Sequence, residues 1–128
     1  MRSTLAIFLA SLGMATLAQC SNYASTCQEC HMWNGHNADN NGHLLKCYCF
    51  GGRFHPNDWS ELHLNERIGN ANGQLVYNSA GHRGSCKDFI LHYSEYWATC
   101  TRADGSEARV MIDLNHWISN RDGRLSFD

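Results

Sequence analysis

The stretch LNERIGNANGQLVY at residues 64–77 recurs as LNHWISNRDGRLSF at residues 114–127. The two copies align without a gap, and Cys49 precedes the first as Cys100 precedes the second. Between this cysteine and the repeated stretch, the first copy has one residue more than the second. Self-similarity at a fixed period is typical of stacked or intertwined structural units. The sequence therefore predicts two related units, and two related sites in any function that they carry.

The composition narrows the class of partner. The chain has 128 residues and a formal net charge of −2, with acidic and basic residues interspersed. A chain of this length forms one domain with a modest core. An even charge balance gives no electrostatic footprint for nucleic acid or for an anionic membrane. We therefore expect an uncharged partner, and neither nucleic acid nor a membrane.

Residues 1–20 read as a secretory signal peptide. A basic residue is followed by the apolar run at residues 5–12, which is too short to span a bilayer, and then by small residues. Cleavage after Ala18 or after Cys20 fits the small-residue rule. Lipid attachment at Cys20 is a third reading, which Gln19 disfavours because that processing prefers a small residue there. We expect a secreted, extracellular protein.

Seven cysteines in a secreted chain of this size predict disulfide bonds. If each copy is self-contained and Cys20 is set aside, the repeat predicts three pairs: Cys27 with Cys49, Cys30 with Cys47, and Cys86 with Cys100. The first two pairs are nested, as in a hairpin whose tip is the Asn-rich segment 36–43. The rival reading is a zinc site in the first copy. An oxidising compartment argues against it, so we expect no metal.

The local patterns predict an all-β fold with short helical turns. Mixed aromatic, branched and polar stretches bounded by turn residues predict strands at residues 44–50, 89–93, 96–101 and 108–114. Residues 64–68 and 114–118 each predict one helical turn with an asparagine cap, and Asn72-Gly73 and Asp122-Gly123 predict tight hairpins. No flexible linker separates the copies, so we expect one compact domain at 21–128, with repeats at about 21–78 and 79–128.

These residues resemble the cyanovirin-N homology (CVNH) family. The resemblance covers 21–128 and rests on motifs that occur in order in both copies: YASTC at 23–27, residues 45–49, LNxxIxNxNGxL from 64, and IDLNHWISNRDGRL from 112. Membership implies a pseudo-symmetric β fold in which the strands of one repeat complete the other. It also implies a lectin without enzymatic activity or cofactor, with two sites for high-mannose glycans. The pair Cys30 and Cys47 and an extended loop at 54–60 depart from the family founder and resemble secreted fungal relatives.

The resemblance also implies the site residues. Sugar hydroxyls are donors and acceptors, so a site needs convergent amides, carboxylates, hydroxyls and backbone groups. The implied first site comprises Asn22, Ser25, Thr26, Phe50, Gly51, Gly52, Asn120, Arg121 and Asp122. The implied second site comprises Asn70, Ala71, Asn72, Ala80, Gly81, Ser85, Thr101, Arg102 and Ala103. Turn formation alone also explains the asparagine pattern, and the two roles are compatible.

Departures from the family pattern predict weak binding, or binding at one site. Residues 50–52 are less polar than in the founder, and Ala80-Gly81 replaces an expected polar pair. The second site is therefore expected to depend on Asn70, Asn72, Ser85 and Arg102. Trp59, expected in the inserted loop, is a candidate for stacking on sugar, whereas Trp117 is expected in the core.

Other functions and assemblies stay open at this point. A small secreted hydrolase that uses histidine as acid and base is one, although no Ser-His-Asp or GxSxG signature supports it. A secreted protein that keeps the scaffold but binds a protein partner is another. We expect a monomer. Strand exchange through the connector 78–84, or a bridge through an unpaired Cys20, would give a dimer.

Overall fold

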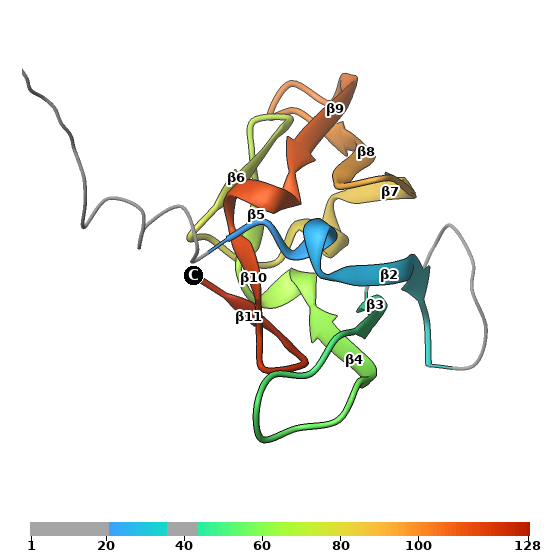
Figure 1. Ribbon diagram of the computed structural model, residues 1–128. Helices are drawn as coiled ribbons and strands as arrows, with labels where there is room; N and C mark the ends of the chain where they lie inside the picture. The colour runs from blue at the N-terminus through green and yellow to red at the C-terminus, as the bar shows by residue number, and fades with distance from the viewer. Residues whose placement is uncertain (1–20, 36–43) are drawn as a thin grey trace, which may run out of the picture.

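The computed structural model of the chain describes residues 21–35 and 44–128 (Figure 1). The predicted signal peptide with Cys20, and the predicted hairpin tip at 36–43, lie outside the described residues. Within the described parts the regular structure is strands and single 3₁₀ turns, which confirms the predicted fold class. The elements are η1 (Tyr23–Ser25), β2 (Cys27–Trp33), β3 (Leu44–Cys49), β4 (Asp58–His63), η2 (Leu64–Glu66), β5 (Ile68–Ala71), β6 (Gln74–Tyr77), η3 (His82–Gly84), β7 (Cys86–His92), β8 (Glu95–Thr101), β9 (Glu107–Asp113), η4 (Leu114–His116), β10 (Ile118–Arg121) and β11 (Arg124–Phe127).

The sequence repeat is a repeat of elements. A 3₁₀ turn, three antiparallel strands, a second 3₁₀ turn and a hairpin occur twice, so that sheets β2-β3-β4 and β7-β8-β9 correspond, as do hairpins β5-β6 and β10-β11. The predicted strands are shifted by up to three residues at their ends. One assignment was wrong: Trp59 lies on β4 and not in a loop, because Asp58 to His63 pair with β3 throughout. Across the described residues, no helix has the length and hydropathy needed to cross a membrane.

The two repeats exchange their hairpins. Strand β11 packs against β4 and β3, and β6 packs against β9, so each three-stranded sheet is completed by the hairpin of the other repeat (Figure 1). Tyr77 of β6 stacks on Trp117 with ring centroids 4.5 Å apart, and its hydroxyl donates to the Asp128 carbonyl at 2.6 Å. These contacts join the two hairpins. Trp117 is half-buried against the core, as predicted.

One asparagine of the other repeat anchors the start of each repeat. Asn115 accepts from the backbone N–H of Asn22 through its carbonyl, at 2.8 Å, and from that of Ala24 through its side chain, at 3.0 Å. Asn65 repeats the arrangement with Gly81 and Arg83. The prediction that these asparagines cap their own helical turns was wrong. Their side chains instead satisfy orphan N–H groups of a distant 3₁₀ turn.

The hairpin turns have the predicted chemistry. The two central residues of each turn have positive φ, 50° and 89° for Asn72-Gly73 and 55° and 94° for Asp122-Gly123. This is the type I′ pattern, which matches the right-handed twist of the flanking strands. Asparagine, aspartate and glycine tolerate it at low cost.

The three disulfides join Cys27 to Cys49, Cys30 to Cys47 and Cys86 to Cys100, as the repeat predicted. The strand register places the outer pair Cys27 and Cys49 opposite each other, and a β-bulge at Glu29, with φ of 55°, shifts the register by one before His31. The corresponding bulge in β7 lies at Asp88, also with φ of 55°. Because the sulfurs of the first copy are bonded in pairs, they are not available as the thiolate ligands of the zinc alternative.

One difference between the cores of the two halves concerns a buried polar group. Tyr23 in η1 corresponds to His82 in η3, and both side chains are fully buried. The His82 imidazole lies 3.0 Å from the Ile68 carbonyl through Nδ1 and 2.8 Å from the Tyr96 hydroxyl through Nε2. The carbonyl fixes Nδ1 as the donor, so Tyr96 donates to Nε2. The Tyr23 hydroxyl, in contrast, has no hydrogen-bond partner.

Tyr23→Phe and Tyr96→Phe should therefore change stability in opposite directions. Removing the unpaired Tyr23 hydroxyl raises the free energy of unfolding by about 1 kcal/mol, and removing the Tyr96 hydroxyl lowers it by about 1–2 kcal/mol, because His82 loses a partner. Burial, with a smaller contribution from the charge of Asp113, raises the pKa of Tyr23. Stability from such a group is present below the unfolded pKa of about 10 and is lost above it, so the advantage of the Tyr23→Phe variant grows in alkali. Guanidinium unfolding at pH 7 and pH 10.5 measures both effects, and a loss of stability in both variants would contradict the assignment.

Candidate functional site

Asn120 holds the first implied site together. Its side-chain amide donates to the Thr26 carbonyl at 3.2 Å, to the Thr26 hydroxyl at 3.1 Å and to the Phe50 carbonyl at 3.0 Å. Its Oδ1 accepts from the N–H of Gly123 at 2.7 Å, which fixes the orientation of the amide. One side chain thus joins the start of β2, the end of β3 and the β10-β11 turn. The site is built from both ends of the chain.

Asn70 does the same in the second implied site. Its amide donates to the Ser85 hydroxyl and to the Thr101 carbonyl, both at 2.9 Å, and its Oδ1 accepts from the N–H of Gly73 at 2.7 Å. Because the hydrogens of both amides are used internally, we assign Asn70 and Asn120 a positioning role. Figure 1 shows the two hairpin turns, and hence the two sites, at opposite ends of the molecule.

The rim of the first site is backbone and one carboxylate. The exposed Asp122 side chain lies against Gly52 so closely that a Cβ at residue 52 would collide with it. A Cβ at Gly51 would collide with the carbonyls of His55 and Pro56, and the Gly51 N–H donates to Asn57 Oδ1 at 2.7 Å. The loop after β3 therefore folds back over glycines. This explains why the sequence is less polar at 50–52 than the family pattern predicts.

The rim of the second site carries side chains instead. Asn72 corresponds to Asp122, and its Oδ1 accepts from the N–H of Ala103 at 2.9 Å. The aliphatic part of Arg102 lies over Gly73, and its guanidinium donates to the Ser106 hydroxyl at 3.2 Å. Hydrogen bonds from the hydroxyl and the N–H of Ser106 lower the pKa of the Asp104 carboxyl in the same loop. The second site thus has a fixed guanidinium at Arg102, and the matched position of the first site, Gly51, has only backbone.

The other implied residues lie further from the two asparagines. The Ser25 hydroxyl donates to the carbonyl of Asn22 at 2.9 Å within η1, and the Gly81 N–H donates to the Asn65 carbonyl at 2.9 Å. Within the described residues, Asn22, Ser25, Ala80 and Gly81 make no hydrogen bond to Asn70 or Asn120. Asn22 and Ser25 lie at η1, and Ala80 and Gly81 lie in the connector before η3. Both segments flank the sites.

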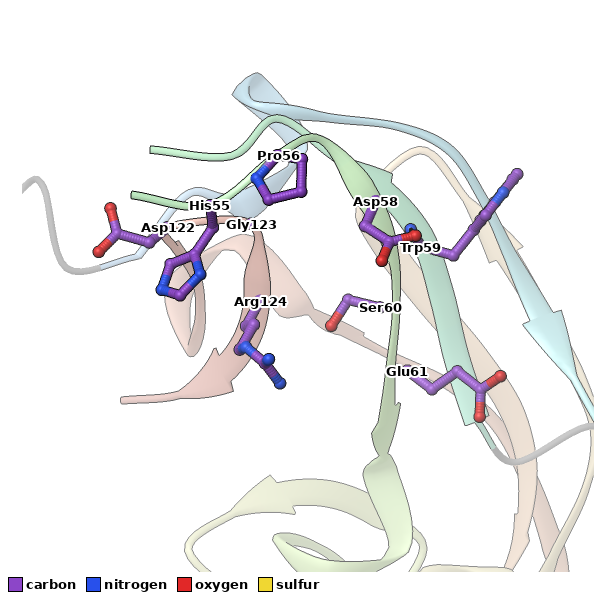
Figure 2. A pocket seen from close by; sticks show the side chains of 9 residues that line it. All are labelled: His55, Pro56, Asp58, Trp59, Ser60, Glu61, Asp122, Gly123 and Arg124. Carbon is purple, nitrogen blue, oxygen red and sulfur yellow. Dashed lines mark hydrogen bonds between the residues drawn. The ribbon is translucent and has the colours of Figure 1, made fainter. Parts of the chain in front are cut away.

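A groove of about 350 Å³ adjoins the first site at Asp122. It lies between β4 and the β10-β11 turn, and its polar lining includes His55, Asp58, Ser60, Glu61, Asp122 and Arg124 (Figure 2). None of the motifs in the sequence indicated this groove. The aligned positions of the two repeats held a signal, because Asp58, Ser60 and Glu61 of β4 correspond to Ala108, Val110 and Met111 of β9.

Trp59 lies at the rim of this groove and is 43 % exposed. Figure 2 shows its indole directed away from His55 and Arg124. The ring makes edge contacts with Tyr48 and His31, at centroid distances of 5.5 Å and 5.9 Å. Any sugar stacking on Trp59 would therefore take place on the outer face of the sheet and not inside the groove.

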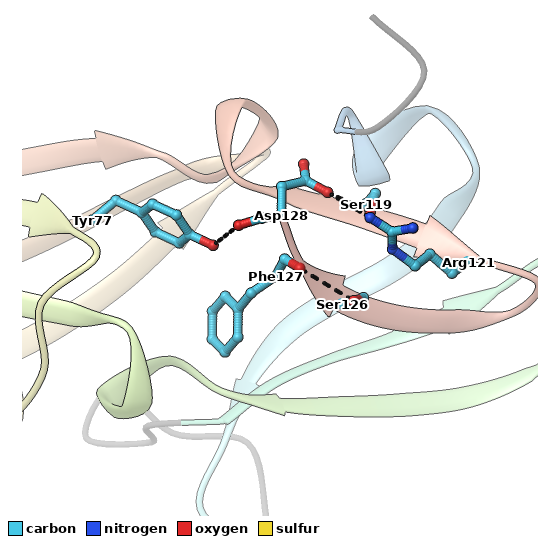
Figure 3. Close-up of polar contacts among 6 residues, drawn as sticks. All are labelled: Tyr77, Ser119, Arg121, Ser126, Phe127 and Asp128. Atoms are coloured by element: carbon cyan, nitrogen blue, oxygen red, sulfur yellow. Dashed lines mark hydrogen bonds and ion pairs between the residues drawn. The ribbon is translucent and has the colours of Figure 1, made fainter. Parts of the chain in front are cut away.

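Arg121 is directed away from the first site. Its guanidinium lies 3.4 Å from the Asp128 carboxylate, which also accepts from the Ser119 hydroxyl at 2.8 Å (Figure 3). The pair is exposed, so its contribution to stability is small. Of the three residues implied in the last turn, Asn120 and Asp122 face the segments of the first site, and Arg121 faces Asp128.

The described residues contain no group of three or more histidine, cysteine, aspartate or glutamate side chains that could hold a metal ion. The chemistry available at both sites is hydrogen bonding through hydroxyl, carboxylate, amide, guanidinium and backbone groups. Those groups match a ligand that has many hydroxyls.

Comparison with known proteins agrees with this architecture. Two repeats that exchange their hairpins define a class of small β-proteins, the CVNH fold. The family model for the CVNH domain matches residues 5–76, more than half of the chain. The chain therefore belongs to the CVNH family. No match was found among curated protein sequences.

Three solved structures are similar to this chain. The CVNH protein of T. borchii is 29% identical, with 84% of this chain and 99% of that chain covered and a TM-score of 0.69. Microvirin, solved as a mannobiose complex, is 24% identical, with 84% and 99% covered and a TM-score of 0.68. A MoCVNH3 variant, solved in complex with (N-GlcNAc)4, is 15% identical, with 86% and 99% covered and a TM-score of 0.72. The chain thus has the fold of lectins that bind glycans.

Proposed function

We propose that this protein is a secreted, metal-independent lectin without enzymatic activity. It binds mannose-containing glycans through two sites, one at each end of the molecule. The observation that carries the proposal is that the same asparagine-centred site is built twice, at Asn120 and at Asn70, from segments distant in the sequence. The mannobiose complex of microvirin supports the choice of mannose. The three disulfides and the signal-like leader support secretion.

The proposed contacts differ between the sites. In the first site the Asp122 carboxylate and the hydroxyls of Ser25 and Thr26 accept from or donate to sugar hydroxyls, and the backbone at 50–52 adds further groups. In the second site Asn72, Arg102 and the Thr101 hydroxyl do so, with Ser85 beside them. A carboxylate accepts two adjacent hydroxyls and a guanidinium donates to two, so both rims suit a vicinal diol.

The first test is a titration of the disulfide-bonded protein with α-linked mannobiose and mannotriose, followed through backbone amide shifts in NMR. We expect shifts at Thr26 and Asn120 to Asp122 for the first site, and at Asn70 to Asn72 and Arg102 for the second. Asp122→Ala should weaken the first site about tenfold or more and leave the second unchanged, because it removes a charged hydrogen-bond acceptor. Arg102→Ala should do the converse, so each variant is the control for the other.

The same titration with EDTA present should give unchanged affinities, because no metal takes part. A folded spectrum that ignores the mannosides but responds to (GlcNAc)4, the ligand of the MoCVNH3 variant, would keep the lectin and change the sugar class. A folded spectrum that ignores both sugars would overturn the proposal and favour a protein partner on the lectin scaffold. We propose a monomer, and two active sites on one rigid monomer would raise the avidity for branched glycans.

A further inference from the structure

We propose that the groove beside Asp122 is an additional saccharide subsite, which extends the first site so that it takes an oligosaccharide of three or more residues. The inference rests on the proposed function, because it concerns the same site. The two sites would therefore differ in the length of glycan that they bind: the first site binds a longer oligosaccharide than the second.

The groove continues the first site without a break. Asp122 lies against Gly52 on the rim of the first site and also lines the groove. Gly123, the next residue of the turn, lies against Gly51 and the Pro56 carbonyl. A glycan chain that contacts the Asp122 carboxylate can therefore extend past the turn, along β4. The volume of about 350 Å³ lies within the range of small-molecule sites.

The groups in the groove suit a neutral polyhydroxyl ligand. Asp58, Glu61 and Asp122 bring carboxylate acceptors, and His55 and Arg124 bring donors, so the groove offers both kinds of hydrogen-bonding group. Among the described residues, the Arg124 guanidinium and the His55 imidazole have no hydrogen-bond or ion-pair partner within the protein. Figure 2 shows both side chains on the hairpin side of the groove, with the Ser60 hydroxyl facing them. A ligand that has several hydroxyls would satisfy these donors and acceptors.

The open edge of β4 adds backbone groups. Among the described strands, β4 is the outer strand of its sheet and pairs with β3 alone. The Trp59 N–H donates to the Asp58 carboxylate at 2.7 Å, so it is directed away from β3. Because alternate residues of a strand direct their backbone groups to the same side, those of Glu61 also face the open edge. The Trp59 N–H is already bonded to Asp58, so the groups on this edge that a sugar can use are the Trp59 carbonyl and the N–H and carbonyl of Glu61.

The duplicated scaffold does not require these residues. The positions of β9 that correspond to Asp58 and Ser60 carry Ala108 and the buried Val110, and Gln74 stands where Arg124 does. Ser60 also has a structural task, because its hydroxyl accepts from the Leu125 N–H at 3.0 Å and holds β11 beside β4. Arg124 has no such task within the described residues. Its exposed guanidinium is therefore available to a ligand in the groove.

The test compares glycan length in the disulfide-bonded protein by calorimetry and NMR. The probes are the disaccharide and tetrasaccharide of two series, α-linked mannose and β-linked N-acetylglucosamine. We expect the first site to bind the tetrasaccharide of its preferred series about tenfold more tightly than the disaccharide. Arg124→Ala should remove about tenfold of the tetrasaccharide affinity and leave the disaccharide affinity unchanged, because one charge-assisted hydrogen bond is lost. Amide shifts at Ser60 and Arg124 should appear with the tetrasaccharide only.

Gln74→Ala is the matched control, because it truncates the corresponding side chain of the other hairpin. It should leave first-site binding of both lengths unchanged. Equal affinity for both lengths at the first site, no effect of Arg124→Ala, or an equal effect of Gln74→Ala would each overturn the subsite and leave the proposed lectin function intact. Failure of the unmodified protein to bind any of the four probes would overturn the lectin function, and the subsite with it.

Discussion

Replacing Cys86 and Cys100 together by serine should lower the free energy of unfolding by about 3 kcal/mol. This bridge joins β7 to β8 across a sequence separation of 14, and no other described disulfide lies in that half of the molecule. Its loss releases the loop-closure restraint on the unfolded chain of the second repeat. Denaturation by guanidinium, read by tryptophan fluorescence, measures the change.

The matched control replaces Cys30 and Cys47 by serine. Cys27 and Cys49 still join the same two strands, β2 and β3, so the unfolded chain stays restrained and the expected loss is about 1 kcal/mol. The Cys30–Cys47 bridge therefore adds little stability to strands that Cys27–Cys49 already joins. Equal losses in the two double variants would show that the bridges act independently of their place in the repeat.

Asn120→Ala should cost about 2–3 kcal/mol and abolish binding at the first site alone. The substitution removes the donor to Thr26 and Phe50 and the acceptor of the Gly123 N–H, and each hydrogen bond contributes about 1 kcal/mol. Asn120→Asp keeps the acceptor for Gly123 but places a carboxylate oxygen against carbonyl oxygens, so it should be at least as destabilising at neutral pH.

Asn70→Ala provides the comparison, because it breaks the equivalent bonds of the second site. It should abolish binding there and preserve the first site. NMR titration with the preferred glycan, combined with thermal unfolding, separates the two effects. Binding at both sites in either variant would contradict the positioning role, and it would leave the asparagines as ordinary turn residues.

The features predictable from the sequence were those with local causes. The type I′ turns follow from Asn72-Gly73 and Asp122-Gly123, and the nested disulfides follow from the repeat and its cysteine spacing. The pairing of Asn70 with Ser85 and of Asn120 with Thr26 could be anticipated only through the family resemblance, since the partners of Asn120 lie at the other end of the chain.

The features that were missed depend on tertiary packing. Asn65 and Asn115 fit a local cap in sequence, yet their side chains bond distant backbone groups, because the exchanged hairpin brings those groups within reach. Trp59 was expected in a loop because it falls in the segment 54–60, which departs from the family founder, but pairing with Tyr48 extends the sheet to Asp58. The polar lining of the groove comes from positions at which β4 and β9 differ. The alignment of the two repeats considered only the positions that they share.

The exchange of hairpins also sets the order in which the protein can be made. Strands β2, β3 and β4 lack the hairpin that covers them until residues 118–127 have been synthesised, because β10 and β11 come last in the chain. The first half therefore cannot close on the ribosome while the second is being translated, although domains generally begin to fold from the N-terminus. We expect the nascent chain to stay open until that hairpin has been synthesised. Its disulfides would then form in a molecule whose two halves fold together.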